Sequence, residues 1–362
     1  MSVREPDAAM PGADPVRLTS RLTSFSHGGG CGCKISPGVL SQLLQGAARL
    51  PVPPQLLVGL DTADDAAVYR IDDQHALVAT TDFFMPIVDD PHDFGRIAAT
   101  NALSDVYAMG ASPILALAIV AMPIDRLPLD VIRRILQGGE SVCASAGIPL
   151  AGGHTIDSVE PIYGLVAIGL ANPAHIRRND EARPGDRLVL GKPLGVGIAS
   201  AALRKERLSP EGYAAMIAST TQLNVSGPAL ARVPGVHAMT DVTGFGLLGH
   251  VLEMCRGARV RMRLSAASVP RLAGTDQRLA EGFVTGASAR NWAAYGHEVQ
   301  LAAGGTESLR ALLTDPQTSG GLLVACEPSS VDEVLAILHR DGFASACEIG
   351  EVLAGEPGVE VR

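Results

Sequence analysis

The segment that most constrains this chain is residues 26–34, in which four glycines surround two cysteines and a lysine. So many glycines argue against a regular helix or strand, because glycine loses more conformational freedom on ordering than any other residue. Cys31 precedes Lys34 by three positions, and a nearby cation favours the thiolate, the form of cysteine that attacks electrophiles. The segment therefore predicts a flexible arm that carries a nucleophile.

Two other interpretations of the cysteine pair stay open. Cys31 and Cys33 could supply two zinc ligands, although no second pair of cysteine or histidine residues completes a set of four. A disordered glycine-rich tail with incidental cysteines is the other interpretation. The spacing favours a function without proving one.

The composition of the whole chain bounds the class of protein. Its 362 residues are 47% hydrophobic, which is enough for two domains of an α/β type, each with its own core. A formal net charge of -9 argues against nucleic acid and against anionic membranes as partners. If an acidic protein binds phosphate groups, metal ions are needed to bridge its carboxylates and the phosphates. The other four cysteines are scattered through apolar sequence, which is typical of a reducing compartment.

Hydrophobic patterning gives no indication of a membrane protein. Residues 1–17 lack the cationic start and apolar run of a signal peptide. The longest apolar run, residues 114–122, is far shorter than the roughly 20 residues that a membrane-spanning helix needs. We therefore expect a soluble cytoplasmic protein.

Apolar periodicity predicts helices that alternate with strands. Helices are expected at residues 36–47, 93–109, 129–146, 195–203 and 330–339, and strands at 66–71, 75–81, 114–122, 163–171, 187–190, 237–240 and 322–325. An alternating tail at 348–361 completes an α/β layer. Residues 172–186 interrupt the pattern and predict a domain boundary. We expect an N-terminal extension and arm through residue 35, a domain at 36–175 and a second domain at 176–362.

Carboxylates and an amide stand at the ends and on the faces of these elements. Asp64 and Asp65 precede one strand and Asp82 closes the next, so three carboxylates could meet at one rim, although paired acids are also typical of a solvated turn. Asn101 and Asp105 are four residues apart and share one face of a helix, where a solvent-facing stripe is the alternative. Magnesium takes oxygen ligands of this kind.

Glycine-rich polar segments follow several of the expected strands. Gly152 and Gly153 are expected to form a turn that leads into His154 and Thr155, and such a turn can bring backbone donors to a phosphate. On its own this is a weak signal, and a lone histidine is more often structural. Asp241 follows strand 237–240 in the same way, and residues 315–321 form another polar loop before strand 322–325.

Together these motifs resemble the selenide, water dikinases, or selenophosphate synthetases, of the aminoimidazole ribonucleotide synthetase superfamily. The resemblance covers all but about the first sixteen residues. It rests on seven motifs in the same order, at residues 30–34, 64–68, 80–84, 99–105, 151–155, 240–246 and 315–321. Members of the superfamily share a two-domain α/β (α+β) architecture. The resemblance implies a homodimer whose N-terminal halves form a shared barrel, with ATP in the interdomain cleft.

The resemblance also implies a role for each matching residue. Cys31 resembles the selenium-handling nucleophile and Lys34 the lysine that meets the ATP phosphates, whereas Cys33 matches a second cysteine that is less clearly required. Asp65, Asp105 and Asp241 resemble the magnesium ligands. The positions similar to nucleotide contacts are Lys34, Thr62, Ala63, Asp64, Asp82, Asn101, Asp105, Gly153, His154 and Thr155.

The implied activity converts ATP, selenide and water into selenophosphate, AMP and orthophosphate, and makes the chain a phosphotransferase with paired acceptors. Mg²⁺ is the implied cofactor, while a monovalent cation and a selenium-delivery partner stay open. Two alternative functions are another ATP-dependent enzyme of the superfamily and a non-catalytic selenium carrier. The cysteine arm argues against the first, and the dispersed acids argue against the second.

Overall fold

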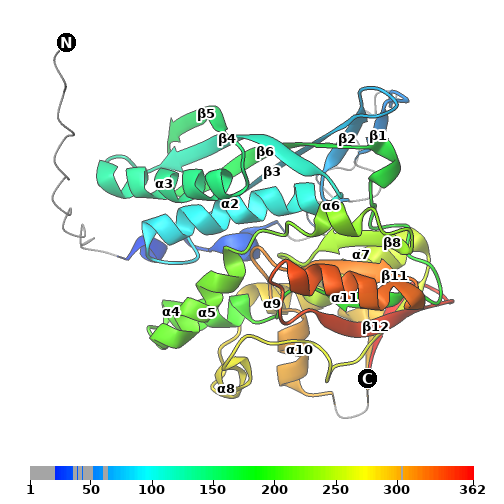
Figure 1. Ribbon diagram of the computed structural model, residues 1–362. Helices are drawn as coiled ribbons and strands as arrows, with labels where there is room; N and C mark the ends of the chain where they lie inside the picture. The colour runs from blue at the N-terminus through cyan, green and yellow to red at the C-terminus, as the bar shows by residue number, and fades with distance from the viewer. Residues whose placement is uncertain (1–20, 36–38, 40–42, 44–51, 60–63, 303–304) are drawn as a thin grey trace.

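The computed structural model describes residues 21–35, 39, 43, 52–59, 64–302 and 305–362. These residues form two α/β halves that lie one above the other, each built on its own sheet (Figure 1). The helix expected at 36–47 lies outside the described residues, apart from the single positions Val39 and Leu43, which are helical. The α/β class predicted from the periodicity is therefore confirmed.

The first half contains a six-stranded sheet in the order β1-β2-β3-β6-β4-β5. Its neighbouring strands pair antiparallel, except for the parallel pair β4 and β5. The strands are β1 (Leu56–Val58), β2 (Ala67–Arg70), β3 (Ala76–Phe84), β4 (Ser112–Met122), β5 (Leu150–Asp157) and β6 (Ile162–Ala171). The strands predicted at 66–71, 75–81, 114–122 and 163–171 correspond to β2, β3, β4 and β6.

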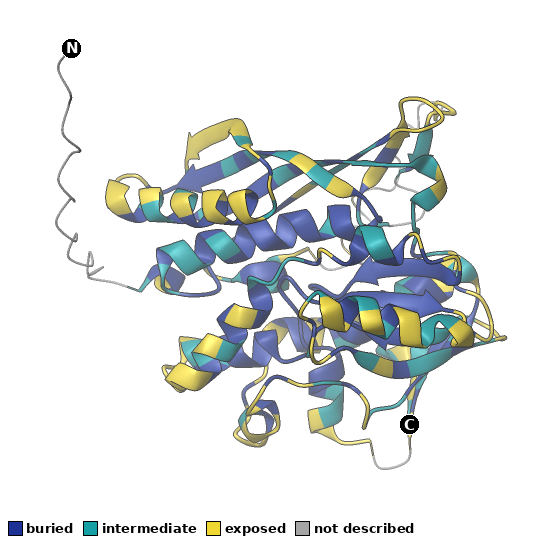
Figure 2. Cartoon of the chain, in the orientation of Figure 1, coloured by how far each residue is buried: buried dark blue, intermediate teal, exposed yellow. Residues whose placement is uncertain are grey.

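Helix α2 (Pro91–Ala108) forms the centre of the molecule. The side chain of Asp90 caps it by accepting a hydrogen bond from Asp93 N, and Pro91 occupies its first turn, where a missing N–H costs nothing. The helix lies between the six-stranded sheet and the second half, so most of its side chains are buried (Figure 2). Helix α3 (Leu129–Ser145) packs beside it and faces solvent on its other side.

The second half contains a seven-stranded mixed sheet in the order β10-β13-β9-β12-β7-β11-β8. Its strands are β7 (Arg187–Leu190), β8 (Val236–Asp241), β9 (Arg261–Leu264), β10 (Val299–Leu301), β11 (Leu322–Cys326), β12 (Cys347–Leu353) and β13 (Gly358–Val361). The α-helices described in this half are α4 (Val196–Arg204), α5 (Pro210–Thr220), α6 (Gly227–Leu230), α7 (Gly246–Ala258), α8 (Thr275–Ala280), α9 (Gly286–Tyr295), α10 (Glu307–Leu313) and α11 (Val331–Arg340). Buried side chains of α7 belong to one apolar cluster, and those of α11 belong to another. The core of this half therefore has two parts, each with a helix packed into it.

One local prediction is wrong. The expected turn at Gly152 and Gly153 is part of the continuous strand β5. Gly153 has φ +152, and a Cβ there would lie 2.1 Å from Ala118 O in the neighbouring strand. Glycine is therefore needed for close approach of two strands and not for a reversal of the chain.

The end of β3 also differs from the prediction. Asp82 does not close this strand, because β3 continues to Phe84, and Asp82 faces inward. Apolar side chains remain exposed on the first sheet, including Tyr69, Phe83 and Ile156. Within the described part of the chain, no helix is long and apolar enough to cross a membrane. The domain boundary expected at residue 175 falls between β6 and β7 and stays a prediction.

Candidate active site

The arm is docked between the two halves of the molecule. Residues Gly30–Cys33 form one turn of 3-10 helix, and Cys31 is only 1% exposed. Gly30 N donates to Met85 O, and Cys31 N donates to Thr318 Oγ1 at 3.1 Å. Gly30 has φ +56, and a Cβ there would lie 2.4 Å from Thr318 Oγ1. The glycine thus permits a left-handed turn in close contact with the 315–321 loop.

Four residues singled out from the sequence form one chain of contacts. Cys31 Sγ donates to Asn101 Oδ1 at 3.2 Å, and Asn101 Nδ2 donates to Asp82 Oδ2 at 2.5 Å. Lys34 Nζ lies 3.6 Å from the same Asp82 oxygen. Asn101 is fully buried, so its face of α2 is not the solvent-facing stripe considered above. The amide connects the arm's thiol to the carboxylate that pairs with the arm's lysine.

Burial of the docked arm opposes the thiolate form that the neighbouring lysine favours. Burial raises the pKa of Cys31 well above its usual value, and the negative charge of Asp82 adds to this, while Lys34 acts in the opposite direction. The sequence shows the lysine but not the burial, and burial is the larger influence. Burial also lowers the pKa of Lys34, but Asp82 and other anionic groups outweigh it and the pKa is raised.

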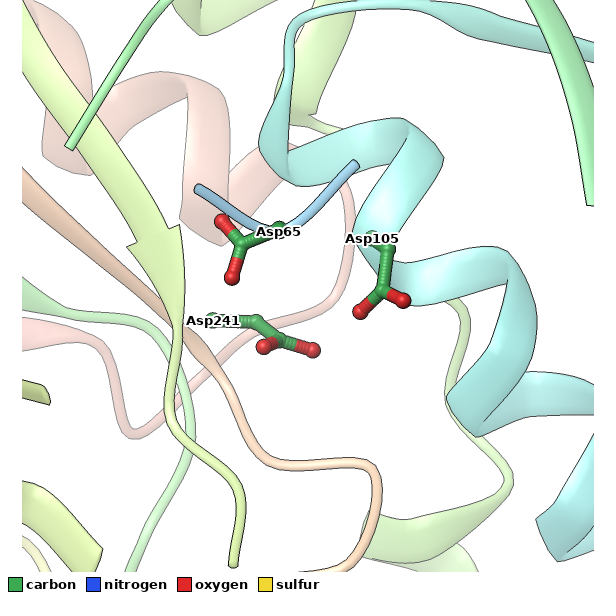
Figure 3. A group of neighbouring side chains, drawn as sticks. All are labelled: Asp65, Asp105 and Asp241. Carbon is green, nitrogen blue, oxygen red and sulfur yellow. The ribbon is translucent and has the colours of Figure 1, made fainter. Parts of the chain in front are cut away.

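Three carboxylates from distant segments converge beside this chain of contacts (Figure 3). Asp65 precedes β2, Asp105 lies in the last turn of α2, and Asp241 ends β8. Each offers one oxygen atom within 4.8 Å of the others. Burial, together with the nearby negative charges, raises the pKa of all three carboxyl groups. Several anions in so small a space are unfavourable without a cation.

Hydroxyl groups hold the three carboxylates in place. Thr240 Oγ1 donates to Asp65 Oδ1 at 2.9 Å, and Thr80 Oγ1 donates to Asp105 Oδ2 at 2.6 Å. Ser104 Oγ donates to Asp241 and itself accepts from Asn224 Nδ2 at 2.7 Å. The other oxygen of Asp65, Oδ2, is buried and has no hydrogen-bond partner among the residues that the structure describes.

This donor set fits a hard divalent cation. An all-carboxylate cluster with a free buried oxygen supplies the oxygen ligands that Mg²⁺ takes, and it leaves room for the waters and phosphates that complete the octahedron. The described histidines and cysteines are not among the three ligands, which argues against zinc. Asp65, Asp105 and Asp241 are thus able to hold Mg²⁺.

Several predicted nucleotide-contacting residues lie elsewhere. Asp64 turns away from the cluster, accepts a hydrogen bond from Asn179 N at 2.8 Å and lies 3.9 Å from Arg178 Nε. Gly153, His154 and Thr155 lie on β5, the exposed edge of the first sheet, with β6 and β4 between them and Asp82 on β3. The predicted contacts Thr62 and Ala63 lie outside the described residues.

The structure adds residues that the sequence did not single out. Asn101 Oδ1 also accepts from Ser319 N at 2.6 Å, and Ser319 adopts a left-handed φ of +53. Lys192 Nζ donates to Ser319 O at 2.8 Å and to Gln222 O, and burial lowers the pKa of Lys192 to about 7. The motif at 315–321 marked this loop, but no local pattern indicates Lys192 or Asn224.

Comparison with known proteins places the chain in a family. Residues 63–171 match the family described as AIR synthase related protein, N-terminal domain, and residues 183–362 match the corresponding C-terminal domain. The chain is 63% identical over 358 residues to the selenide, water dikinase of Burkholderia pseudomallei (strain K96243), covering 99% of each chain. It is 55% identical over 344 residues to that of Rhizobium meliloti (strain 1021), covering 95% and 99%.

Solved structures with the same fold are more distant in sequence. Thiamine-monophosphate kinase from Stenotrophomonas maltophilia K279a matches with a TM-score of 0.60 at 20% identity, covering 90% of this chain and 94% of its own. The hydrogenase maturation protein HypE in complex with ATP matches with a TM-score of 0.61 at 17% identity, covering 88% and 86%. At this level of identity the likeness concerns the fold alone.

Proposed function

This chain belongs to the selenide, water dikinase family, and we propose that it uses the arm and the carboxylate cluster described above to carry out that family's reaction. It is an enzyme that converts ATP, selenide and water into selenophosphate, AMP and orthophosphate. The observation that carries the assignment of residues is the chain of contacts from Cys31 through Asn101 and Asp82 to Lys34. It joins a nucleophilic atom to a cation beside a cluster able to hold Mg²⁺.

The carboxylate cluster is the proposed place of Mg²⁺. Bound at Asp65, Asp105 and Asp241, the ion would neutralise the charge of the ATP phosphates. Thr240, Thr80 and the Ser104–Asn224 pair orient the carboxylate oxygens, which is what fixes a ligand set in advance of binding. Lys34 adds an ammonium group that the docked arm carries to the same place.

The arm is the proposed selenium-handling element. While the arm is docked, the raised pKa of Cys31 favours the protonated thiol, which donates a hydrogen bond to Asn101 Oδ1. The thiol is therefore unreactive in this conformation. Undocking would expose the sulfur, remove the cause of its raised pKa and allow it to meet selenide. Redocking would then bring Cys31 and Lys34 together to the nucleotide and exclude water.

We also propose a homodimer formed through the first half. The strand β5 leaves a sheet edge open, and apolar side chains are about half exposed at that edge, as Ile156, and further into the sheet on β3, as Phe83. Open edges and apolar patches of this kind are normally covered. In such a dimer the proposed nucleotide contacts of Gly153, His154 and Thr155 would be made across the interface. The six cysteines are all free, and the cytoplasm is the proposed location.

Anaerobic phosphorus NMR of the protein with ATP, Mg²⁺ and selenide tests the proposal. The expected result is selenide-dependent formation of AMP, orthophosphate and a phosphorus signal coupled to selenium, with none of them in a control without selenide. Formation of ADP alone would assign the chain to another ATP-dependent activity of the same fold. Binding of selenide without any consumption of ATP would favour a selenium carrier.

A further inference from the structure

A cavity of about 340 Å³ lies beside the arm, and none of the carboxylates of the cluster lines it. The arm contributes its backbone at Gly28, Gly29 and Gly32, and the opposite wall consists of the C-terminal part of α4 and the start of α9. The volume falls within the range of small-molecule sites. Thr318, which accepts the hydrogen bond from Cys31 N, also lines it, so the cavity adjoins the residues that hold Cys31.

The cavity is cationic in a protein that is acidic overall. Arg204, Lys205 and Arg290 line it, and none of the described lining residues is an aspartate or glutamate, although the chain carries a net charge of -9. Within the described part of the chain, none of these three side chains forms an ion pair with a carboxylate. Lys205 Nζ lies 5.6 Å from the centre of the Phe283 ring and is exposed.

The two arginines are directed at the arm. Arg204 Nη2 donates to Gly28 O at 2.6 Å, and Arg290 Nη2 donates to Gly32 O at 2.9 Å. A guanidinium has five N–H donors, so each arginine keeps donors for an anion while it holds the arm. An anion bound here would therefore lie beside the residues that flank Cys31.

Charge favours a separate approach for the selenium anion, away from the carboxylates that would hold the Mg²⁺-bound nucleotide. Hydrogenselenide is an anion at neutral pH, and approach from the other side of the arm would expose it to Asp65, Asp82, Asp105 and Asp241. The cationic cavity provides an approach of the opposite sign, and a focused field of this kind raises the local concentration of a charged ligand. The volume exceeds that of one hydrogenselenide ion, so a small acidic molecule that carries a terminal selenide also fits.

We propose that this cavity is the docking site of the anionic selenium substrate and holds it beside the arm, where Cys31 meets it when the arm undocks. The identity of the ligand as a selenium anion rests on the proposed function. The cationic character of the cavity beside Cys31 does not rest on the proposed function.

The first test compares two alkylating reagents and needs no turnover. Iodoacetate is an anion and iodoacetamide is neutral, so the ratio of their rates at Cys31, followed by mass spectrometry of the arm peptide, reports the charge that surrounds the thiol as the arm opens. Lys205→Glu is expected to lower this ratio by about 5-fold or more. Lys205 is exposed, and the two hydrogen bonds to arm carbonyls come from Arg204 and Arg290, so the change is expected to leave the fold intact. Arg207→Glu, two residues along and outside the described lining, is the matched control and is expected to leave the ratio unchanged.

The second test separates the substrates kinetically. In Lys205→Glu the KM for selenide is expected to rise by about 5-fold or more while the KM for ATP stays unchanged. Assays with free hydrogenselenide and with a glutathione-bound selenide distinguish the two sources of the anion: an effect on either one supports the site. An unchanged alkylation ratio, or equal increases of both KM values, would overturn the proposal. If the unmodified protein shows no selenide-dependent turnover but the alkylation ratio falls, the proposed function fails and the anion route stands.

Discussion

The two sides of the arm differ in charge and in what their charged groups contact. On one side, Asp65, Asp105 and Asp241 gather carboxyl groups whose pKa values are raised, and Oδ2 of Asp65 has no hydrogen-bond partner among the described residues. On the other side, Arg204 and Arg290 donate to arm carbonyls beside a cavity without a described acid. The net charge of the whole chain, -9, describes neither of these two environments. A few residues of glycine-rich backbone separate an environment for a cation and its phosphates from one for an anion.

The largest effect is expected from removing the nucleophile that faces the acidic side. Cys31→Ser should lower selenide-dependent AMP formation by about 10³-fold or more, because a serine hydroxyl cannot replace a soft thiolate. ATP binding, followed as a thermal shift, should be largely unaffected. Cys347→Ser, at a half-buried cysteine whose Sγ bonds Ser268 O in the second half, is the control. Full activity of the Cys31 variant would remove the sulfur from the reaction.

The next effect concerns the carboxylate cluster itself. Asp65→Asn should lower activity about 10²-fold by removing one oxygen ligand. The same change should stabilise the metal-free protein by about 1 kcal/mol, because one buried like charge is lost. Mg²⁺ should raise the Tm of the unchanged protein more than that of the variant.

Asp73→Asn controls for the loss of a carboxylate, since Asp73 is exposed in a turn of the same half. It is expected to change stability by no more than about 0.5 kcal/mol. A variant at Asp65 that is less stable without metal, or that responds fully to Mg²⁺, would contradict the assignment of the cluster as a cation site.

A smaller effect is expected from disturbing the arm that separates the two sides. Gly30→Ala places a Cβ 2.4 Å from Thr318 Oγ1 at φ +56, and a left-handed alanine costs roughly 1–2 kcal/mol. The docked state should therefore lose population, and neutral iodoacetamide should alkylate Cys31 about tenfold faster. Gly32→Ala is the matched control, because its Cβ would meet only ordinary contacts, the nearest at 3.5 Å. Equal rates in both variants would show that burial of Cys31 does not depend on this turn.

The smallest effect is a dependence of stability on pH. The pKa values of Asp65, Asp105 and Asp241 are raised in the folded protein, so the folded state binds more protons than the unfolded chain. Metal-free stability should therefore fall as the pH rises above the usual aspartate pKa and through the raised values. Asp315, whose pKa burial raises to about 7, acts in the same direction.

Mg²⁺ separates the cluster from Asp315. The increase in Tm that Mg²⁺ causes should grow from pH 5 to pH 8, because protons compete with the cation at the cluster. Scanning calorimetry with and without Mg²⁺ measures this difference. A constant increase across that range would mean that the cluster is already ionised at pH 5.

The elements with strong periodicity were predicted well, and the errors share one cause. Helices α2, α3 and α11 lie within two residues of their predicted bounds, because the 3.6-residue pattern of apolar side chains reports the buried face directly. The predicted turn at Gly152 and Gly153 was wrong because Gly153 serves a close approach to Ala118 in another strand. The expected thiolate at Cys31 was wrong for the docked arm because its burial depends on residues from both halves.

By itself, the sequence determined the residue types available for chemistry, the order of the motifs and most of the regular elements. These properties are local, since a side chain's kind and the face that it occupies depend on near neighbours in the chain. Only the tertiary structure decided that Asp65, Asp105 and Asp241 meet, that Asp64 turns away and that the cations gather on the opposite side of the arm. Distances between remote segments follow from how α2 packs between the two halves, and no local pattern contains that information.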